Sequence, residues 1–418
     1  MTMTLTYDEV EEIGARYGTP FYVFHEQAFR NNYDEIVRAF SSRYDKFILA
    51  YSYKTNYIPY LCKIIESKGG FAEVVSRLEY DLALKVGQEP KKIVFNGPVK
   101  DYTDVEFALN NQTIVNLDSW YEIDYVRKYA TNNPGRIAKV GLRINVDLTD
   151  DAGASHLQEG IRTGRFGFSP EGDNIAKVVS ELTKADNVVI NCLHGHSSTR
   201  DRSVWCYEKI ARTLCDVGSQ HAPETVEYID IGGGIFGYIP PQMRRTQTPG
   251  FDDYAMAVCS ALTDNPWIKR RRPYLVLEPG VAMVANTISY VTKVVSVKTI
   301  RGQVFVTVDG SAFHTKPTFH KINNPDSVIS KAGRDRRGVY NVVGATCMEK
   351  DYLLTDVEGA LPQQDDYIKI DSVGAYTIVL SPPFINGAPP ILVGQGGQYK
   401  QIRRKQNLMD MFGCFTFD

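Results

Sequence analysis

Short apolar runs recur through the first two thirds of the chain, separated by stretches whose apolar residues have helical spacing. Such runs predict buried strands of a parallel sheet, since these are apolar on both faces. We predict strands at 47–53, 71–75, 93–96, 113–118, 137–145, 188–196, 226–232 and 274–279. Helices are predicted between them, most clearly at Tyr60–Ser67, Glu79–Val86, Val105–Leu109, Ile175–Leu182 and Val204–Val217. Glycines stand where helix C-caps are expected, at Gly69–Gly70, Gly87 and Gly218.

This alternation of strands and helices favours an α/β fold, a (β/α)8 TIM barrel of about 250 residues. An open, doubly wound sheet alternates in the same way and remains the alternative. After residue 285 helical spacing fades, and β-rich stretches follow at Ile288–Ile300, Val304–Asp309, Tyr340–Val343, Tyr367–Asp371, Tyr376–Leu380 and Ile391–Val393. We therefore predict a barrel over 26–284 and a C-terminal, mainly β domain over 285–418. The N-terminal segment 1–25 is predicted to be part of the β domain.

Composition narrows the class of protein. A chain of 418 residues with a formal net charge of -2 has room for two domains and gives no reason to expect nucleic acid or a membrane as partner. The polar start MTMTLTYDEV does not resemble a signal peptide. The seven cysteines are scattered without a CxxC pair, which disfavours a disulfide framework and structural zinc. We expect a cytoplasmic protein without a metal.

Lys54 ends the first of these apolar runs, FILAYSYKTN. A lysine held at the edge of a sheet is partly desolvated, which lowers its pKa and makes its amine a nucleophile. That chemistry suits a Schiff base with a carbonyl substrate or with pyridoxal phosphate. Taken alone, a surface lysine at the start of a loop is the commoner interpretation.

Polar residues follow several other strands, where a barrel of this kind collects its chemistry. The strand ends carry Glu73, Asn96, Arg143 with Asn145, His194 with His196, and Glu278. A neutral His196 imidazole can stack on a planar ring, and a protonated one can act as an acid. A core histidine bonded to backbone, or a His-x-His metal site, are the alternatives.

Gly232, Gly233 and Gly234 follow the strand YIDI and leave bare backbone at its end. Backbone amides there can approach a phosphate, although a tight turn would also use glycine. Glu278, facing a pyridine nitrogen, would keep that nitrogen protonated, or it would pair with a nearby arginine.

These motifs, taken together and in order, resemble the fold type III (alanine-racemase-like) pyridoxal-phosphate decarboxylases, the group of diaminopimelate, ornithine and arginine decarboxylases. The resemblance covers nearly the whole chain. The motifs that carry it are YGTPFYVF, AYSYKTN, EVVSRLEY, NGPVK, LRINVD, RFGF, LHGHSS, IDIGGGIFG, LEPG, GATCMEKD and DSVGAY.

The resemblance implies pyridoxal 5′-phosphate as cofactor, with Lys54 as its Schiff-base lysine and His196 stacked on its ring. Gly232, Gly233 and Gly234 would bind the phosphate and Glu278 would face the ring nitrogen. The remaining expected cofactor contacts are Glu73, Arg143, Thr199 and Gly280. Cys347 and Tyr376 would come from the partner subunit of a homodimer, Cys347 to return a proton after carbon dioxide leaves and Tyr376 to contact the phosphate. A buried, inert cysteine is the ordinary interpretation of Cys347.

The chain departs from the family pattern around the substrate. Val281 stands where the family usually has an arginine after EPG, and Thr199 where it has a phosphate-contacting serine. Met348 replaces the acidic residue that holds the distal amine of the substrate, and Glu349 is a weak substitute beside it. Lys316 before Pro317 replaces an arginine and keeps a possible carboxylate contact. These departures predict a modified or conjugated amino acid as substrate, as in siderophore biosynthesis, rather than diaminopimelate, lysine or ornithine.

Three other functions stay open at this point. One is a diaminopimelate or other diamino-acid decarboxylase of primary metabolism. A racemase on the same fold would need an acid or base on each face of the α-carbon and would not need Cys347. A catalytically silent cofactor-binding regulator would be in keeping with Val281, but not with Lys54, His196 and Glu278 together.

Overall fold

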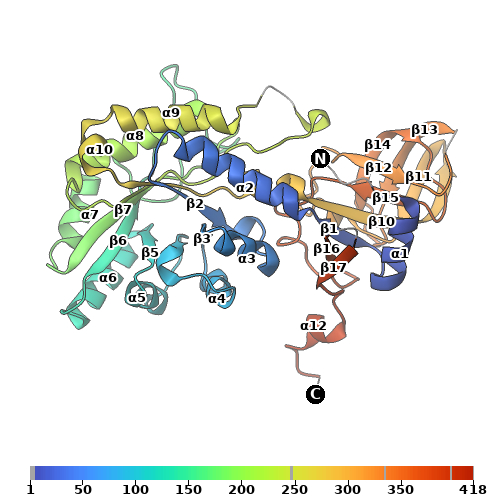
Figure 1. Ribbon diagram of the computed structural model, residues 1–418, viewed down its shortest axis with the longest axis horizontal. Coiled ribbons are helices and arrows are strands. Elements are labelled where there is room, and N and C mark those ends of the chain that lie inside the picture. Colours follow the sequence, from blue (N-terminus) through green and yellow to red (C-terminus); the bar gives the residue numbers. More distant parts are fainter. Residues whose placement is uncertain (1–4, 245–247, 334–335, 396–397, 418) are drawn as a thin grey trace. The chain divides into compact units, whose positions relative to one another are not determined.

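The computed structural model describes residues 5–244, 248–333, 336–395 and 398–417 (Figure 1). The chain forms two compact units. The first comprises Asn32–Gly237 and Thr248–Ala282, and the second comprises Met1–Asn31, Tyr238–Gln247 and Met283–Asp418. The domain limits 26–284 and 285–418 stay a prediction, whereas the compact units change over at Asn32 and Met283.

The first unit is a closed barrel of parallel strands (Figure 1). Its strands are β2 (Phe47–Ser52), β3 (Phe71–Val74), β4 (Ile93–Phe95), β5 (Ile114–Leu117), β6 (Ala138–Arg143), β7 (Val188–His194), β8 (Tyr228–Asp230) and β9 (Tyr274–Leu277). Strand β9 pairs back onto β2, with Leu277 opposite Leu49, and this pairing closes the barrel. The TIM barrel is therefore confirmed, and the open sheet was the wrong alternative.

The barrel interior explains why its strands are continuously apolar. Ala50, Val94, Ile114, Cys192 and Val276 come from five different strands and form one buried cluster. Fully burying a side chain such as Val276 contributes about 1.5–3 kcal/mol. Because the outer face of each strand is also covered, both faces select apolar residues.

Helices lie outside the strands (Figure 1). They are α2 (Glu26–Ser41), α3 (Pro59–Ser67), α4 (Arg77–Lys85), α5 (Tyr102–Asn110), α6 (Trp120–Asn132), α7 (Asn174–Leu182), α8 (Val204–His221), α9 (Phe251–Asp264) and α10 (Pro266–Arg271). The clear predictions missed α6, α9 and α10. Gly69 and Gly87 follow helix ends with positive φ, as expected of glycines there. Gly218 was wrongly predicted as a C-cap: it lies inside α8, where a Cβ would meet the Trp267 ring at 2.3 Å.

The second unit is built on a mainly antiparallel sheet. Its strands are β1 (Phe21–Phe24), β10 (Ile288–Ile300), β11 (Gln303–Val308), β12 (Asp326–Ile329), β13 (Arg337–Val343), β14 (Tyr352–Ala360), β15 (Tyr367–Ile370), β16 (Ile391–Gln395) and β17 (Gln398–Arg403). Strand β1 lies between β10 and β16, so the N-terminal segment contributes a central strand to this sheet. Its Val23 packs with Val291, Leu392 and Ile13, the last from helix α1 (Tyr7–Tyr17).

One predicted strand is wrong. Tyr376–Leu380 has no strand pairing and ends in a turn, and Tyr376 has a φ of 55°, a left-handed conformation that strands do not use. Strands β12, β14 and β17 were missed because polar residues interrupt their apolar positions. Within the described residues, no helix is long and apolar enough to cross a membrane.

Candidate active site

Lys54 stands just beyond the C-terminal end of β2, in the short 3-10 turn Tyr53–Thr55. Tyr53 and Thr55 are buried on either side of it, so the turn is anchored and only the lysine is partly exposed. Its Nζ lies 2.5 Å from Glu73 Oε2 at the end of β3. The parallel register pairs Ser52 with Glu73, and the Ser52 hydroxyl donates to the same carboxylate oxygen at 2.6 Å. The lysine amine is therefore held in place by a buried carboxylate.

A chain of buried polar groups runs from Glu73 around the strand ends. Asn96 Nδ2 donates to Glu73 Oε1 at 3.1 Å and to Glu278 Oε1 at 2.6 Å. The amide of Asn116 donates in turn to Asn96 Oδ1 at 2.8 Å. Each of these residues lies on a different strand or directly after it, which is why parallel strands bring them to one edge. The network fixes both carboxylates relative to Lys54.

Glu278 follows β9 and lies between a basic side chain, His194, and an acidic one, Asp230. His194 Nε2 is 3.5 Å from Glu278 Oε2, and Asp230 completes a buried group whose ligand atoms lie within 4.8 Å of one another. Burial alone would raise the pKa of Glu278, but His194, Lys54 and Asp230 together hold it below its usual range. Burial and then the adjacent Glu278 raise the pKa of Asp230 well above its usual value. The opposite directions of the two pKa shifts favour the negative charge on Glu278 and the proton on Asp230.

His196 is held as a neutral ring. The Gly233 amide donates to His196 Nδ1 at 3.2 Å, which places the ring proton on Nε2. Burial, then the charges of Arg143 and Lys54, lower the pKa of His196 to about 3. Arg143 fixes the backbone at this position: its guanidinium donates to the His196 carbonyl at 3.2 Å and to Asp118 Oδ1 at 3.1 Å. A neutral ring suits stacking on a planar cofactor.

The glycine triplet forms a close-fitting backbone surface. Gly232 and Gly234 have φ of 68° and 97°, and a Cβ on Gly233 would lie 2.0 Å from the Glu278 carbonyl oxygen. The Gly232 amide donates to Asp230 Oδ1 at 2.9 Å. The Gly233 amide donates to His196 Nδ1, whereas the Gly234 amide donates to no acceptor among the described residues. The Gly234 amide is therefore available to an anion. This cradle fits the phosphate predicted there.

The two other cofactor contacts predicted in the barrel, Gly280 and Thr199, also lie on strand-end loops. A Cβ on Gly280 would lie 2.0 Å from Thr55 Oγ1, so the loop after β9 packs against the lysine turn only because glycine is there. Thr199 lies in the loop after β7, where its Oγ1 accepts from the Arg202 amide at 3.1 Å. The structure thus gathers the barrel residues predicted from the sequence at one edge.

The other predicted residues belong to the second unit. Lys316 is buried, and burial lowers the pKa of its amine. Cys347 is exposed, so its ordinary interpretation as a buried, inert cysteine is wrong. With Met348 and Glu349 it lines a cavity of about 480 Å³. Tyr376 is 40% exposed. The parts that these five residues would play in the active site stay predictions.

Sequence reasoning missed several residues of the network. The sequence places Asn96 and His194 at strand ends without indicating a role for them, and it does not single out four others: Ser52, Asn116, Asp118 and Asp230. The signal that would have found them is position, because each stands at or within one residue of the C-terminal end of a strand. A polar residue at such a point in an apolar strand faces the catalytic edge of a barrel.

Comparison with known proteins places this geometry in a family. The model of the pyridoxal-binding domain of pyridoxal-dependent decarboxylases matches residues 31–285. Diaminopimelate decarboxylase of Neisseria meningitidis serogroup B is 29% identical over 415 residues, covering 97% of this chain and 95% of that protein. The enzyme of that name from Archaeoglobus fulgidus is 28% identical over 410 residues, covering 96% and 94%.

A solved structure has the same fold. The crystal structure of diaminopimelate decarboxylase from M. jannaschii in complex with L-lysine superposes with a TM-score of 0.85 at 24% identity. The match covers 97% of this chain and 94% of that one. At this identity the likeness supports the architecture of both units.

Proposed function

The chain belongs to the pyridoxal-dependent decarboxylases and is a PLP-dependent amino-acid decarboxylase, and from this premise we propose that it removes the α-carboxylate of a diamino acid of the diaminopimelate type. The observation that carries the proposal is the Lys54–Glu73 pair at the barrel edge, linked through Asn96 to Glu278. It provides a fixed amine and a fixed carboxylate for the two ends of one cofactor ring.

The barrel residues fit pyridoxal 5′-phosphate. Lys54 would bind its aldehyde, the neutral His196 would stack on its ring, and Gly232–Gly234 would receive its phosphate. When bound and protonated at the ring nitrogen, the cofactor supplies an electron sink for the pair left at the α-carbon. Glu278 would keep that nitrogen protonated, since it is the anion of the Glu278–Asp230 pair. Cys347 would return a proton to the α-carbon.

The comparisons favour a diamino acid over the conjugated amino acid of siderophore biosynthesis. Curated relatives that match almost the full length of this chain are diaminopimelate decarboxylases. Loss of carbon dioxide from diaminopimelate leaves lysine, and lysine is the ligand in the M. jannaschii complex. Diaminopimelate is therefore the first substrate to test.

The test is a substrate panel on the purified holoenzyme. Diaminopimelate, lysine, ornithine and arginine are incubated separately, while carbon dioxide release and the amine product are measured. We expect turnover of diaminopimelate with a kcat on the order of 1 per second or more. Loss of optical activity without carbon dioxide would indicate a racemase instead. A wild-type protein with no visible Schiff-base absorbance would indicate the silent regulator.

A second candidate substrate rests on Met348. Its thioether lines the cavity of the second unit beside Cys347, where an acidic residue would hold a distal ammonium. An apolar side chain there favours a substrate whose distal amine is conjugated and uncharged. Turnover of an Nε-acyl lysine in preference to diaminopimelate would support this candidate, and Met348→Glu is then expected to reverse the preference.

We also propose that two copies pair so that each barrel receives Cys347 and Tyr376 from its partner. Both side chains are exposed in the single chain, as are the nearby apolar residues Leu380 and Ile385. An exposed apolar stretch of this kind is typical of a surface that another protein covers.

Mixing two inactive variants tests the shared site. Lys54→Ala removes the barrel lysine and Cys347→Ala removes the proton donor, so each homodimer is inactive. Random re-pairing after mild dissociation makes half the dimers mixed, each with one intact site, and restores about one quarter of the wild-type activity. If Cys347 served its own barrel, the mixture would stay inactive.

A further inference from the structure

Two loops of the barrel are joined to each other by backbone contacts beyond the strand ends. One loop follows β6 and the other follows β7. Leu157 and Thr199 form an isolated antiparallel bridge. The Gln158 amide donates to the Ser198 carbonyl at 3.1 Å, and the Arg200 amide to the His156 carbonyl at 3.1 Å. The second loop contains Thr199, the predicted phosphate contact, so the first loop sets the position of its backbone.

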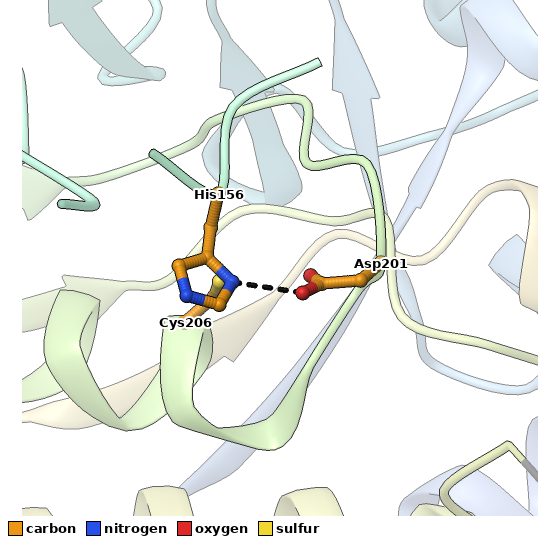
Figure 2. Close-up of side chains that lie close together, drawn as sticks. All are labelled: His156, Asp201 and Cys206. Atoms are coloured by element: carbon orange, nitrogen blue, oxygen red, sulfur yellow. Dashed lines mark hydrogen bonds and ion pairs between the residues drawn. The ribbon is translucent and has the colours of Figure 1, made fainter. Parts of the chain in front are cut away.

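The His156 ring lies at this junction (Figure 2). Its Nδ1 is 2.8 Å from Asp201 Oδ2, and its Nε2 is 3.3 Å from Asp150 Oδ2. The Trp205 ring covers the imidazole, with 4.9 Å between the ring centroids. Only 15% of the His156 side chain is exposed. The ring therefore connects a carboxylate of its own loop to one of the neighbouring loop.

Both carboxylates are themselves anchored. Asp150 Oδ1 accepts from the amides of Ala152 and Ala154, which close a tight turn just before His156. Asp201 Oδ1 accepts from the Ser203 amide at 3.1 Å, directly before helix α8. The imidazole thus joins a preformed turn to the start of a helix. It therefore fixes the two loops relative to each other and does more than fill space.

A metal ion fits this cluster less well than a hydrogen-bonded clamp does. The ligand atoms of His156, Asp201 and Cys206 lie within 4.8 Å of one another. A metal at Nδ1 must lie in the plane of the ring, where the Asp201 oxygen is already at hydrogen-bond distance. Figure 2 shows the Cys206 sulfur behind the face of the ring. The hydrogen bonds of His156 to Asp201 and Asp150 therefore act as a clamp between the two loops.

We propose that His156 is a positioning residue that holds the Thr199 loop in the conformation that receives the cofactor phosphate. This inference rests on the proposed function, since it assumes that the barrel binds pyridoxal phosphate. The base of the first loop is closed independently, because Asn145 Nδ2 donates to the carbonyls of Gly164 and Phe166. Loss of the clamp is therefore expected to loosen the tip of this loop and the Thr199 backbone, while the barrel stays folded.

The experiment compares two cofactor probes on the apoprotein. Dissociation constants of pyridoxal 5′-phosphate and of pyridoxal, which lacks the phosphate, are measured from the Schiff-base absorbance. We expect His156→Ala to weaken binding of the phosphorylated probe about tenfold, and that of pyridoxal less than about twofold. Asp201→Asn weakens the same contact from its other side and is expected to act in the same direction. Trypsin should also cut faster after Arg162 in His156→Ala, because the loop tip is released.

Two matched variants complete the design. His156→Asn keeps a donor at the position of Nδ1 and is expected to restore most of the phosphate-dependent affinity. His221→Ala changes a histidine at the other end of α8 and should bind both probes like the wild type. Equal weakening of both probes in His156→Ala, or no weakening, would overturn the inference alone. A wild-type protein that gives no Schiff base with either probe would overturn the proposed function, and the inference with it.

Discussion

The barrel edge and the Cys347 loop (residues 344–351, between β13 and β14) carry the two halves of the proposed chemistry. The carboxylates of the barrel edge are buried, whereas Cys347 is exposed. At the barrel edge Glu73 and Glu278 are nearly inaccessible, and each has partners within hydrogen-bond distance. In the second unit Cys347 and Glu349 are exposed at the rim of an open cavity. The barrel groups are organised within one chain, whereas the Cys347 loop has no comparable enclosure in the described residues.

This difference separates cofactor binding from proton return. A buried, hydrogen-bonded network costs much free energy to rearrange, so it suits a group that stays bound through many turnovers. A proton donor must meet successive substrates and can be completed by a partner subunit. Changes at the barrel edge should therefore affect cofactor binding, and changes in the Cys347 loop should affect turnover and substrate preference but not cofactor binding.

The largest effect is expected from Lys54→Ala. Without its amine the barrel cannot form a Schiff base, and kcat should fall by at least about 10³-fold. The visible absorbance band should vanish. Lys63→Ala, which changes an exposed lysine on α3, is the control and should leave both properties unchanged. A Lys54→Ala protein that keeps the band would place the Schiff base elsewhere.

Cys347→Ala should separate the two regions. We expect kcat to fall about 10²- to 10⁴-fold, the range for loss of a positioned general acid. Cofactor affinity should stay within about twofold, because the barrel edge is untouched. Cys414→Ala removes another exposed cysteine and should be silent. Unchanged kcat in Cys347→Ala would mean that the barrel performs the whole reaction.

The Glu278–Asp230 pair tests the charge assignment at the barrel edge. Glu278→Gln removes the anion and should lower kcat about 10²- to 10³-fold. Asp230→Asn should change kcat by less than about threefold, since the raised pKa of Asp230 already favours its neutral form. Steady-state kinetics of both variants, each saturated with cofactor, make the comparison. Equal losses would show that the two carboxyl groups share the charge.

The smallest effect concerns the pH dependence of stability and involves one buried histidine, His314. Burial lowers the pKa of His314, in the second unit, from 6.5 to about 4. Unfolded chains bind this proton below pH 6.5 and the folded protein does not, so stability is complete above pH 6.5 and falls as pH decreases towards 4. At pH 5 the loss from His314 is about 2 kcal/mol.

The corresponding measurement is urea unfolding at pH 7 and pH 5. In the wild type the Tyr290 hydroxyl lies 2.8 Å from His314 Nδ1. His314→Asn keeps an acceptor near that position but removes the titrating imidazole, so it should reduce the stability loss between the two pH values. His221→Ala, again as control, should lose as much as the wild type. If His314→Asn loses as much unfolding free energy between pH 7 and pH 5 as the wild type, the His314 imidazole of the wild type is protonated in the folded protein too.

Much of the barrel site was predictable because its residues stand out from the sequence immediately around them. Lys54, Glu73 and Glu278 each interrupt an apolar strand at its end, and the strand spacing indicates where that end falls. The turn at Tyr376–Leu380 and the packing glycine Gly218 were not predictable in this way. Tyr376 takes a left-handed conformation. Gly218 is required because a Trp267 ring, distant in sequence, leaves no room for a Cβ.

The sequence by itself determined the alternation of strands and helices, and with it the edge at which Lys54, His196 and the glycines gather. Only the tertiary structure decided which partners those residues have. Glu278 meets Asn96 and Asp230 because a closed barrel brings distant strand ends together. The same closure removes water from the Glu278–Asp230 pair, which raises the pKa of Asp230, while His194 and Lys54 lower the pKa of Glu278. Periodicity is a local property of a chain, whereas register and desolvation depend on segments far along it.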